Sequence, residues 1–206
     1  MIVIFDLDYT LLDSKKFRQD LASVFDMNID EFNKYYEKYF KSKSLNYGIE
    51  EHLKILKKQK QINFTEEKKI KQKLNIFFKK MDDYLFPGVE KALKYFRNNG
   101  NKLILISFGN LDWQKLKIDN LKIKKYFDKI ILEDSAKGKN DFLKSLKNSQ
   151  EKILIINDNA KETFAMAKLL GKNCKFKIIQ GPYSYNIKHK EKIYNDFENF
   201  AKEEIN

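Results

Sequence analysis

Hydrophobic residues show two different spacings along the chain, one typical of strands and one typical of helices. Residues 2–5 form an unbroken run of strand-forming apolar side chains, and similar short runs recur within residues 102–107, 129–132, 152–158 and 175–179. An unbroken apolar run favours a strand that is buried on both faces, as in a parallel sheet. Segments with helical spacing separate the later runs, so this part of the chain predicts βαβ units.

Residues 14–85 show the helical spacing: their apolar residues recur every three or four positions, without a strand pattern between them. We expect four helices, with Ser14, Asp30 and Thr65 as candidate N-terminal caps of the first, second and fourth. The clearest apolar stripe, which predicts packing between helices, contains Phe32, Tyr35, Tyr36, Tyr39 and Phe40. The pair Pro87-Gly88 then ends the helical pattern.

Together the two spacing patterns predict an α/β protein with a helical insertion. We expect residues 1–13 and 86–206 to form a core with a Rossmann-like parallel sheet, and residues 14–85 to form a separate small bundle of helices. At 206 residues the chain is long enough for one well-cored domain plus such an insertion.

The charge and the cysteine content narrow the classes of function. The net charge is +12, but residues 14–85 carry +6 and the rest of the chain carries the other +6, so the charge is spread evenly and does not favour nucleic-acid binding. Cys174 is the single cysteine, which excludes a disulfide framework and a cysteine metal cluster. No apolar segment reaches the length of a membrane span or a signal peptide, so we expect a cytoplasmic protein without membrane association.

Polar residues stand where three of the predicted strands end. Asp6 and Asp8 follow the first strand, Ser107 ends the second, and Asp158 ends the strand within residues 152–158. The carboxyl ends of parallel strands open onto one edge of the sheet, where the ligand crevice lies. Two carboxylates there need a positive partner, because burying unpaired anions is costly. A metal ion or a lysine could supply it.

The order of these features resembles the haloacid dehalogenase (HAD) superfamily of phosphohydrolases. The stretch "IFDLDYTLLD" after a strand, the strand-end serine, a lysine before the predicted helix "NDFLKSLK" and a strand-end acid occur in the order of the four family motifs. The resemblance covers essentially the whole chain, and residues 14–85 look like the family's cap, inserted after the first motif. The chain departs from the common pattern at Tyr9, where the family often has glycine, and at Asn157, which replaces a frequent glycine or aspartate.

The resemblance implies a role for each acidic residue. Asp6 would be the nucleophile that forms an aspartyl phosphate, because a carboxylate yields an acyl phosphate that can be hydrolysed. Asp8 would protonate the leaving oxygen and then activate water. Asp6, the backbone carbonyl of Asp8, and Asp158 would bind Mg²⁺, which takes oxygen ligands. Glu162 stands where the family has its second acid of the fourth motif, and it either binds the metal through a water or is a solvated charge.

The resemblance also implies how the phosphoryl group is held. Ser107 and the backbone amides of Phe108 and Gly109 would donate hydrogen bonds to its oxygens. Lys137 and Lys139 both precede the helix; we prefer Lys139 as the residue that steadies the nucleophile and neutralises phosphate, because it fits the family's K-x-x-x-L spacing.

These features lead to a Mg²⁺-dependent phosphatase acting on a small phosphorylated metabolite as the first hypothesis. Alternatives are a phosphomutase of the same fold, or a non-enzymatic basic binding module on a degenerate HAD fold. The intact set of Asp6, Asp8 and Asp158 favours an enzyme.

Overall fold

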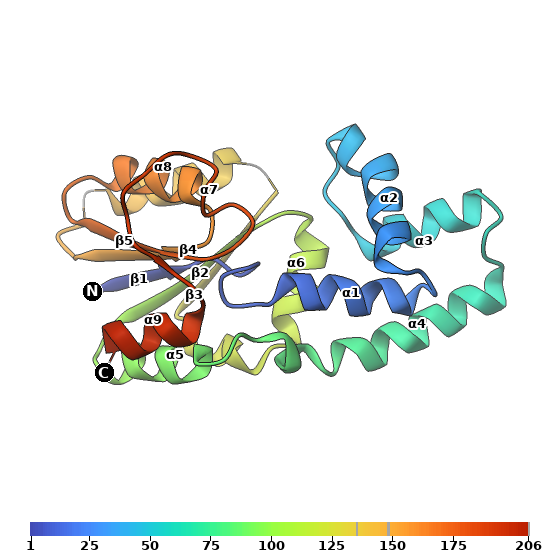
Figure 1. Ribbon diagram of the computed structural model, residues 1–206, viewed down its shortest axis with the longest axis horizontal. Helices are drawn as coiled ribbons and strands as arrows, with labels where there is room; N and C mark the ends of the chain where they lie inside the picture. The colour runs from blue at the N-terminus through green and yellow to red at the C-terminus, as the bar shows by residue number, and fades with distance from the viewer. Residues whose placement is uncertain (135, 148, 206) are drawn as a thin grey trace. The chain divides into compact units, whose positions relative to one another are not determined.

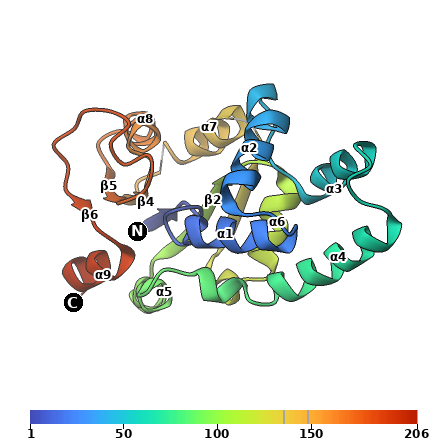
Figure 2. The same cartoon turned by 45° about the vertical axis from the view of Figure 1, so that its right-hand side comes forward.

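The computed structural model describes residues 1–134, 136–147 and 149–205, with the backbone alone for residues 136–140 and 205. Its strands are β1 (Ile2–Phe5), β2 (Lys102–Phe108), β3 (Lys129–Glu133), β4 (Ile153–Asn157), β5 (Cys174–Ile179) and β6 (Ile193–Tyr194). Its helices are α1 (Ser14–Val24), α2 (Ile29–Tyr39), α3 (Ile49–Lys58), α4 (Phe64–Phe78), α5 (Val89–Asn98), α6 (Leu111–Asp119), α7 (Ala136–Leu146), α8 (Ala160–Leu170) and α9 (Phe197–Ile205) (Figures 1 and 2). Short 3₁₀ helices span Lys41–Lys43, Met81–Tyr84 and Lys122–Tyr126.

The strands form one parallel sheet, which confirms the predicted α/β fold. Within the described residues it has six strands in the order β3-β2-β1-β4-β5-β6, and every neighbouring pair is parallel. The chain builds outward from β1 to β3 and then returns to place β4 on the other side of β1. This reversal puts a topological switch point at the carboxyl ends of β1 and β4, which is where open α/β sheets bind their ligands.

Strand β1 is apolar throughout because both of its faces are covered. Ile2 and Ile4 belong to a cluster that includes residues of α7 and α8, such as Leu143 and Met166. On the opposite face the Phe5 ring contacts the rings of three other phenylalanines, with centroid distances of 6.0, 6.0 and 6.4 Å to Phe96, Phe127 and Phe197. Figure 1 shows α7 and α8 on one side of the sheet and α5 and α9 on the other.

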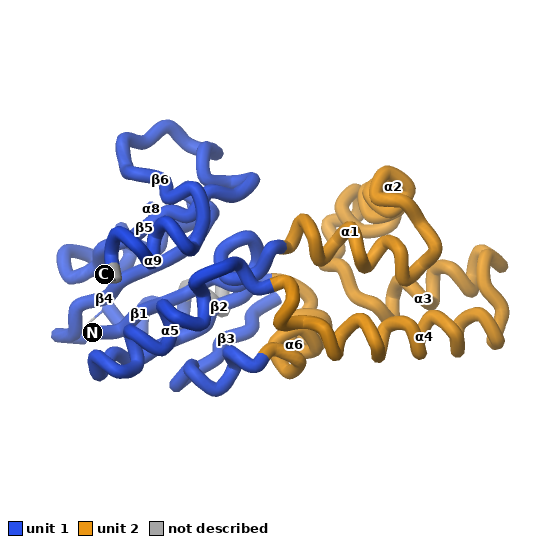
Figure 3. Tube along the Cα trace, turned by 60° about the horizontal axis from the view of Figure 1, so that its bottom comes forward, with its two compact units in different colours: residues 1–13, 85–108, 122–206 blue, residues 14–84, 109–121 orange. Residues whose placement is uncertain are grey.

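The chain divides into two compact units, which Figure 3 draws in different colours. Unit 1 contains Met1–Asp13, Leu85–Phe108 and Lys122–Asn206, and it includes the sheet. Unit 2 contains Ser14–Tyr84 and also Gly109–Leu121.

Helix α6 belongs to unit 2, whereas the sequence pattern predicts residues 109–121 to be part of the core. The reason is the aromatic side chain of Trp113. Its ring centroid lies 5.7 Å from that of Phe17, 5.2 Å from that of Tyr47 and 5.7 Å from that of Phe78. Trp113 is half-buried, and the packing of so large a ring against aromatic residues of α1, α4 and the loop before α3 ties α6 to the helical unit.

Two helices of unit 2 begin earlier than the sequence predicts. Asn28, rather than Asp30, caps α2, and Asn63, rather than Thr65, caps α4. In both cases the asparagine side chain accepts a backbone N–H three residues on, and the glutamate at that position bonds back to the cap. The Asn-x-x-Glu spacing is the signal for such a reciprocal capping box.

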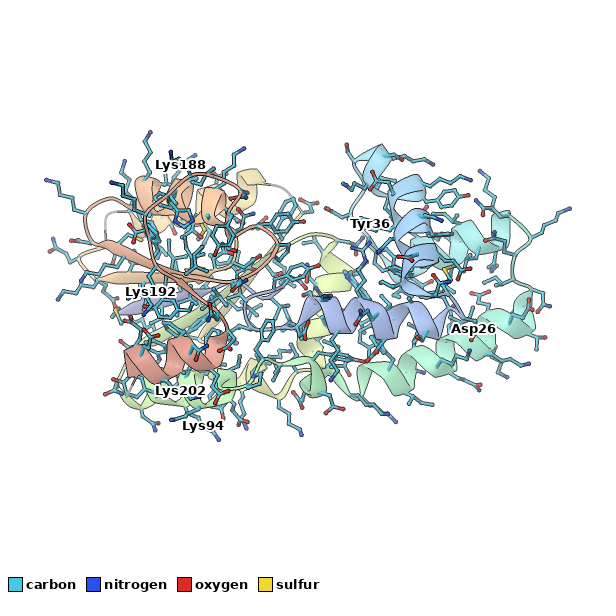
Figure 4. All side chains as sticks on the ribbon, in the orientation of Figure 1. Asp26, Tyr36, Lys94, Lys188, Lys192 and Lys202 are labelled. Carbon is cyan, nitrogen blue, oxygen red and sulfur yellow. The ribbon has the colours of Figure 1, made fainter. Side chains whose placement is uncertain are left out.

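Side-chain pairs join the helices within unit 2. Lys73 of α4 binds Asp26 after α1 at 2.7 Å, and the Arg18 guanidinium lies 4.6 Å from the centroid of the Tyr36 ring (Figure 4). His52 is fully buried between the rings of Phe25 and Tyr35, and burial lowers its pKa to about 3, so the imidazole is neutral.

The spacing of apolar residues over 190–205 predicts one terminal amphipathic helix, but the structure has a strand and a shorter helix there. The short strand β6 comes first and extends the sheet at the edge beyond β5, and α9 follows it. Among the described residues, no helix combines the length and the apolar character that crossing a membrane requires.

Candidate functional site

The sheet brings three of the predicted site segments together in unit 1. β1 lies between β2 and β4, so its carboxyl end adjoins the ends of both neighbours. The Asp6 N–H donates to the Ile156 carbonyl at 3.0 Å, which continues the pairing of β1 with β4 as far as Asp6. Asp6 and Asp8 are half-buried, and Ser107 on β2 is buried.

The turn after β1 is anchored by a threonine whose role the sequence does not reveal beyond its place in D-x-D-x-T. The Leu7 carbonyl accepts the N–H groups of Leu11 and Leu12, both at 3.0 Å, so the chain folds back sharply. Thr10 is completely buried in this turn, and its hydroxyl oxygen accepts the Asp158 N–H at 2.9 Å. One hydrogen bond therefore links the turn that carries Asp8 to the strand end that carries Asp158.

Tyr9 adopts the left-handed backbone conformation, with φ at 59°. This conformation costs a residue with a Cβ atom about 1–2 kcal/mol, whereas glycine takes it freely. Glycine would therefore fit this position of the turn without strain. The Tyr9 ring meets the Tyr183 ring edge-on, at a centroid distance of 6.4 Å.

The backbone strain at Tyr9 can be measured with two substitutions. Tyr9→Gly and Tyr9→Ala both remove the ring and its contact with Tyr183, but only the glycine removes the cost of a positive φ. We expect Tyr9→Gly to be more stable than Tyr9→Ala by about 1 kcal/mol in urea denaturation at constant m value. An alanine variant that is as stable as the glycine variant would show that the turn relaxes out of this conformation.

Asp158 is a buried acidic group of the site with a strongly shifted pKa. Its side chain is 3% exposed, and among the described residues its Oδ2 atom has no hydrogen-bond partner. Burial, together with the negative charges of Asp8 and Glu162, raises the pKa of Asp158 to about 7. These charges act on one another, so the three acidic side chains belong to one electrostatic cluster.

Glu162 lies in the first turn of α8, half-buried. Its N–H donates to the Asn159 side chain at 3.1 Å, and this asparagine caps the helix. An acidic side chain in the first turn is favoured by the helix dipole. Both the metal-linked and the solvated interpretation of Glu162 agree with this position.

The donor set suits a hard cation such as Mg²⁺. Its members are carboxylate and carbonyl oxygens, and the Oδ2 atom of Asp158 is a buried acceptor without a donor among the described residues. Within those residues no group of three or more histidine, cysteine or acidic side chains is arranged to hold a metal ion. The predicted set needs only two carboxylates and one backbone carbonyl, and Mg²⁺ commonly completes its shell with waters and substrate phosphate.

Two predicted phosphate-binding groups have a different placement. α7 begins at Ala136, so Lys137 and Lys139 lie inside the helix rather than before it, and the side chains of both lie outside the described residues. Phe108 is the last residue of β2 and is 45% exposed, whereas Gly109 is already part of unit 2.

A segment without a recognisable sequence motif also contacts the acidic cluster. It is the β5–β6 loop, residues 180–192, which connects the last two strands of the sheet. The Tyr183 carbonyl accepts the Ala160 N–H at 3.2 Å, and Gly181 lies directly against Asp158. The only sequence signal for this contact is the Gly-Pro pair after an apolar strand, which predicts a turn but not its neighbour.

The sequence and the fold were also compared with known proteins. The family description "haloacid dehalogenase-like hydrolase" matches residues 3–176, which is most of the chain. A search of curated proteins finds no match to the sequence.

Solved structures with a similar fold cover nearly all of the chain. A haloacid dehalogenase-like hydrolase structure from Burkholderia xenovorans LB400 superposes with a TM-score of 0.74 at 15% identity, covering 99% of this chain and 96% of its own. A structure from Thermotoga maritima assigned as a β-phosphoglucomutase has a TM-score of 0.60 at 17% identity, covering 98% and 97%. A structure from Haemophilus somnus 129PT, a predicted phosphoglycolate phosphatase, has a TM-score of 0.58 at 18% identity, covering 98% and 96%.

Proposed function

The chain belongs to the haloacid dehalogenase-like hydrolases, and from this premise we propose that it is a Mg²⁺-dependent phosphatase that acts on small phosphorylated metabolites. In this proposal unit 1 is the catalytic core and unit 2 is the cap of the family. The observation that carries it is the acidic cluster at the switch point of the sheet, where the buried Asp158 carboxylate is repelled by Asp8 and Glu162. A cation would convert this repulsion into binding energy.

The proposed reaction has two steps. In the first, an Asp6 carboxylate oxygen attacks phosphorus while the bond from phosphorus to the leaving oxygen breaks, and Asp8 donates a proton to that oxygen. In the second, Asp8 takes a proton from water as the water attacks phosphorus. The bond between phosphorus and Asp6 then breaks, which releases inorganic phosphate and restores both side chains.

The position of each group supports these roles. Asp6 is held at the end of a central strand by its backbone bond to Ile156, so the nucleophile sits on a rigid element. Asp8 is on the turn that Thr10 ties to Asp158. Mg²⁺, when bound by Asp6, the Asp8 carbonyl and Asp158, would neutralise the charge of the carboxylates and of the phosphate.

The phosphoryl oxygens need donors as well as a metal. Ser107 lies on the strand next to β1, and we propose that its hydroxyl and the backbone N–H groups of Phe108 and Gly109 bind these oxygens. Lys139 is proposed as the cation that steadies Asp6. The substrate class is supported by the names of two similar structures, a phosphoglycolate phosphatase and a β-phosphoglucomutase.

Hydrolysis of an aryl phosphate tests the proposal. We expect phosphate release in the presence of Mg²⁺, complete loss of activity on addition of EDTA, and recovery when Mg²⁺ is added in excess. A panel of phosphorylated metabolites then identifies the preferred leaving group. The Asp6→Asn variant, purified in parallel, measures any contaminating phosphatase.

Two results would contradict the proposal. One is an unchanged rate in the presence of the chelator. The other is no hydrolysis of any phosphomonoester in the panel with Mg²⁺ present. Transfer of the phosphoryl group to a sugar phosphate in preference to water would instead identify the phosphomutase alternative.

A further inference from the structure

Gly181, in the β5–β6 loop, lies unusually close to the Asp158 carboxylate. A Cβ atom added at Gly181 would lie 2.5 Å from Oδ2, 2.7 Å from Cβ and 3.0 Å from Cγ of Asp158. Contacts under 3.0 Å are not seen for real Cβ atoms, so no side chain larger than hydrogen fits while Asp158 keeps its place. The backbone of the loop at Gly181 therefore packs directly against the Asp158 carboxylate.

Hydrogen bonds join the β5–β6 loop to the residues that follow Asp158. The Asn186 side chain accepts the Lys161 N–H at 2.9 Å and donates to the Asn159 side chain at 2.8 Å. The Tyr183 carbonyl accepts the Ala160 N–H at 3.2 Å. The loop is thus bonded to three consecutive residues after Asp158, and Figure 1 shows it passing beside α8.

The loop is also braced internally. The Ser184 hydroxyl donates to the Gly181 carbonyl at 2.9 Å and accepts the Gly181 N–H at 3.3 Å. Ser184 is completely buried, and its own carbonyl is bonded to the His189 ring at 2.8 Å. Gly181 is therefore held in position by a hydroxyl that water cannot reach.

From these contacts we propose that the β5–β6 loop is a positioning element for the metal-binding carboxylate, with Gly181 as the residue that sets the orientation of Asp158. This inference rests on the proposed function, because it takes Asp158 as a Mg²⁺ ligand. Gly181 acts through Asp158 and does not touch substrate or metal itself. Its role is to leave one carboxylate orientation available, so that the site is organised before Mg²⁺ binds.

Substitution of Gly181 by alanine is a clean steric test. The φ angle of Gly181 lies outside the left-handed region, so alanine there meets no backbone strain and acts only through its contact with Asp158. Gly171→Ala is the matched control: Gly171 has φ at 80° and no atom within 4 Å of an added Cβ, so alanine there strains the backbone at the other end of α8 without touching the site.

The measurement is the rise in melting temperature as Mg²⁺ is titrated into the substrate-free protein. We expect Gly181→Ala to raise the Mg²⁺ concentration at half-maximal effect by about tenfold or more, in the range that loss of a supporting group has at metal sites. Gly171→Ala should lower the starting melting temperature and leave the Mg²⁺ midpoint unchanged. In an activity assay, Gly181→Ala should regain much of its rate at high Mg²⁺ with KM for an aryl phosphate little changed.

The outcomes separate this inference from the proposed function. A wild-type protein whose melting temperature does not respond to Mg²⁺ would overturn the metal site and both proposals. A normal wild-type response with a Gly181→Ala midpoint within twofold of it, or an equal shift in Gly171→Ala, would overturn the positioning role alone. If Gly181→Ala does not fold, Ser184→Ala carries the test, because it removes the brace at Gly181 without adding an atom. We then expect a midpoint shift of about two- to fivefold, and an unchanged midpoint would reject the role.

Discussion

Asp6→Asn is expected to abolish turnover while the protein stays folded. The carboxamide has the same shape as the carboxylate, but its oxygen is a poor nucleophile and cannot form an acyl phosphate. Losing the nucleophile of a covalent mechanism lowers the rate by about 10⁴-fold or more. Asp6 is only half-buried, and its backbone N–H, which bonds to the Ile156 carbonyl, is unaffected, so we expect a change in unfolding free energy below about 1 kcal/mol.

The measurement combines single-turnover kinetics with denaturation. Asp141→Asn is the matched control, because Asp141 is an exposed acid on α7 whose ion pair with Lys144 lies on the surface. Such pairs contribute little, so this variant should keep both rate and stability. An Asp6→Asn protein that is folded and hydrolyses aryl phosphate at the wild-type rate would remove Asp6 from the role of nucleophile.

Asp158→Asn should affect activity and stability in opposite directions. Without its carboxylate the metal site is incomplete, and we expect activity to fall by about 100-fold or more. In the metal-free protein the same change removes a buried anion that Asp8 and Glu162 repel. The variant should therefore be more stable than the wild type at pH 8 without metal, by about 1–3 kcal/mol.

The pH dependence follows from the direction of the pKa shift. The pKa of Asp158 is raised in the folded protein to about 7, so the folded state holds its proton more tightly than the unfolded chain does. Its contribution to stability is fully present below the ordinary carboxyl range and is lost as the pH rises through about 7. The advantage of Asp158→Asn should accordingly shrink between pH 8 and pH 5.

Chemical denaturation at the two pH values, with EDTA or with Mg²⁺, checks this prediction. Mg²⁺ should stabilise the wild type at pH 8 and leave Asp158→Asn unchanged. A variant that is less stable than the wild type without metal at pH 8, or one that Mg²⁺ still activates normally, would contradict it.

Much of the core follows from local sequence patterns. Both faces of β1 are covered, so residues 2–5 had to be apolar, and the same reasoning predicts the other buried strands. The site residues Asp6, Asp8 and Asp158 are predictable because parallel topology carries the ends of their strands to one edge of the sheet. Their chemical roles stay predictions.

Other features depend on contacts that no local pattern encodes. The hydrogen bond from Asp158 to Thr10 and the contact with Gly181 join residues far apart in sequence. The grouping of α6 with unit 2 depends on which rings surround Trp113, and the true caps of α2 and α4 depend on where each helix begins. The two-residue strand β6 is too short to leave a periodic signal.

The central position of β1 has a consequence for the order in which the protein folds. Its Ile2 pairs with Lys102 on one side and with Ile153 on the other. During synthesis, β1 can therefore complete its pairing only after both partner strands have left the ribosome. Such pairings of distant residues close long loops and slow the search for the native topology. Most of unit 2, by contrast, is one continuous segment, Ser14–Tyr84, whose local helical contacts can form early. Until β2 and β4 emerge, the apolar side chains of β1 are exposed, and at that stage the chain is most vulnerable to aggregation.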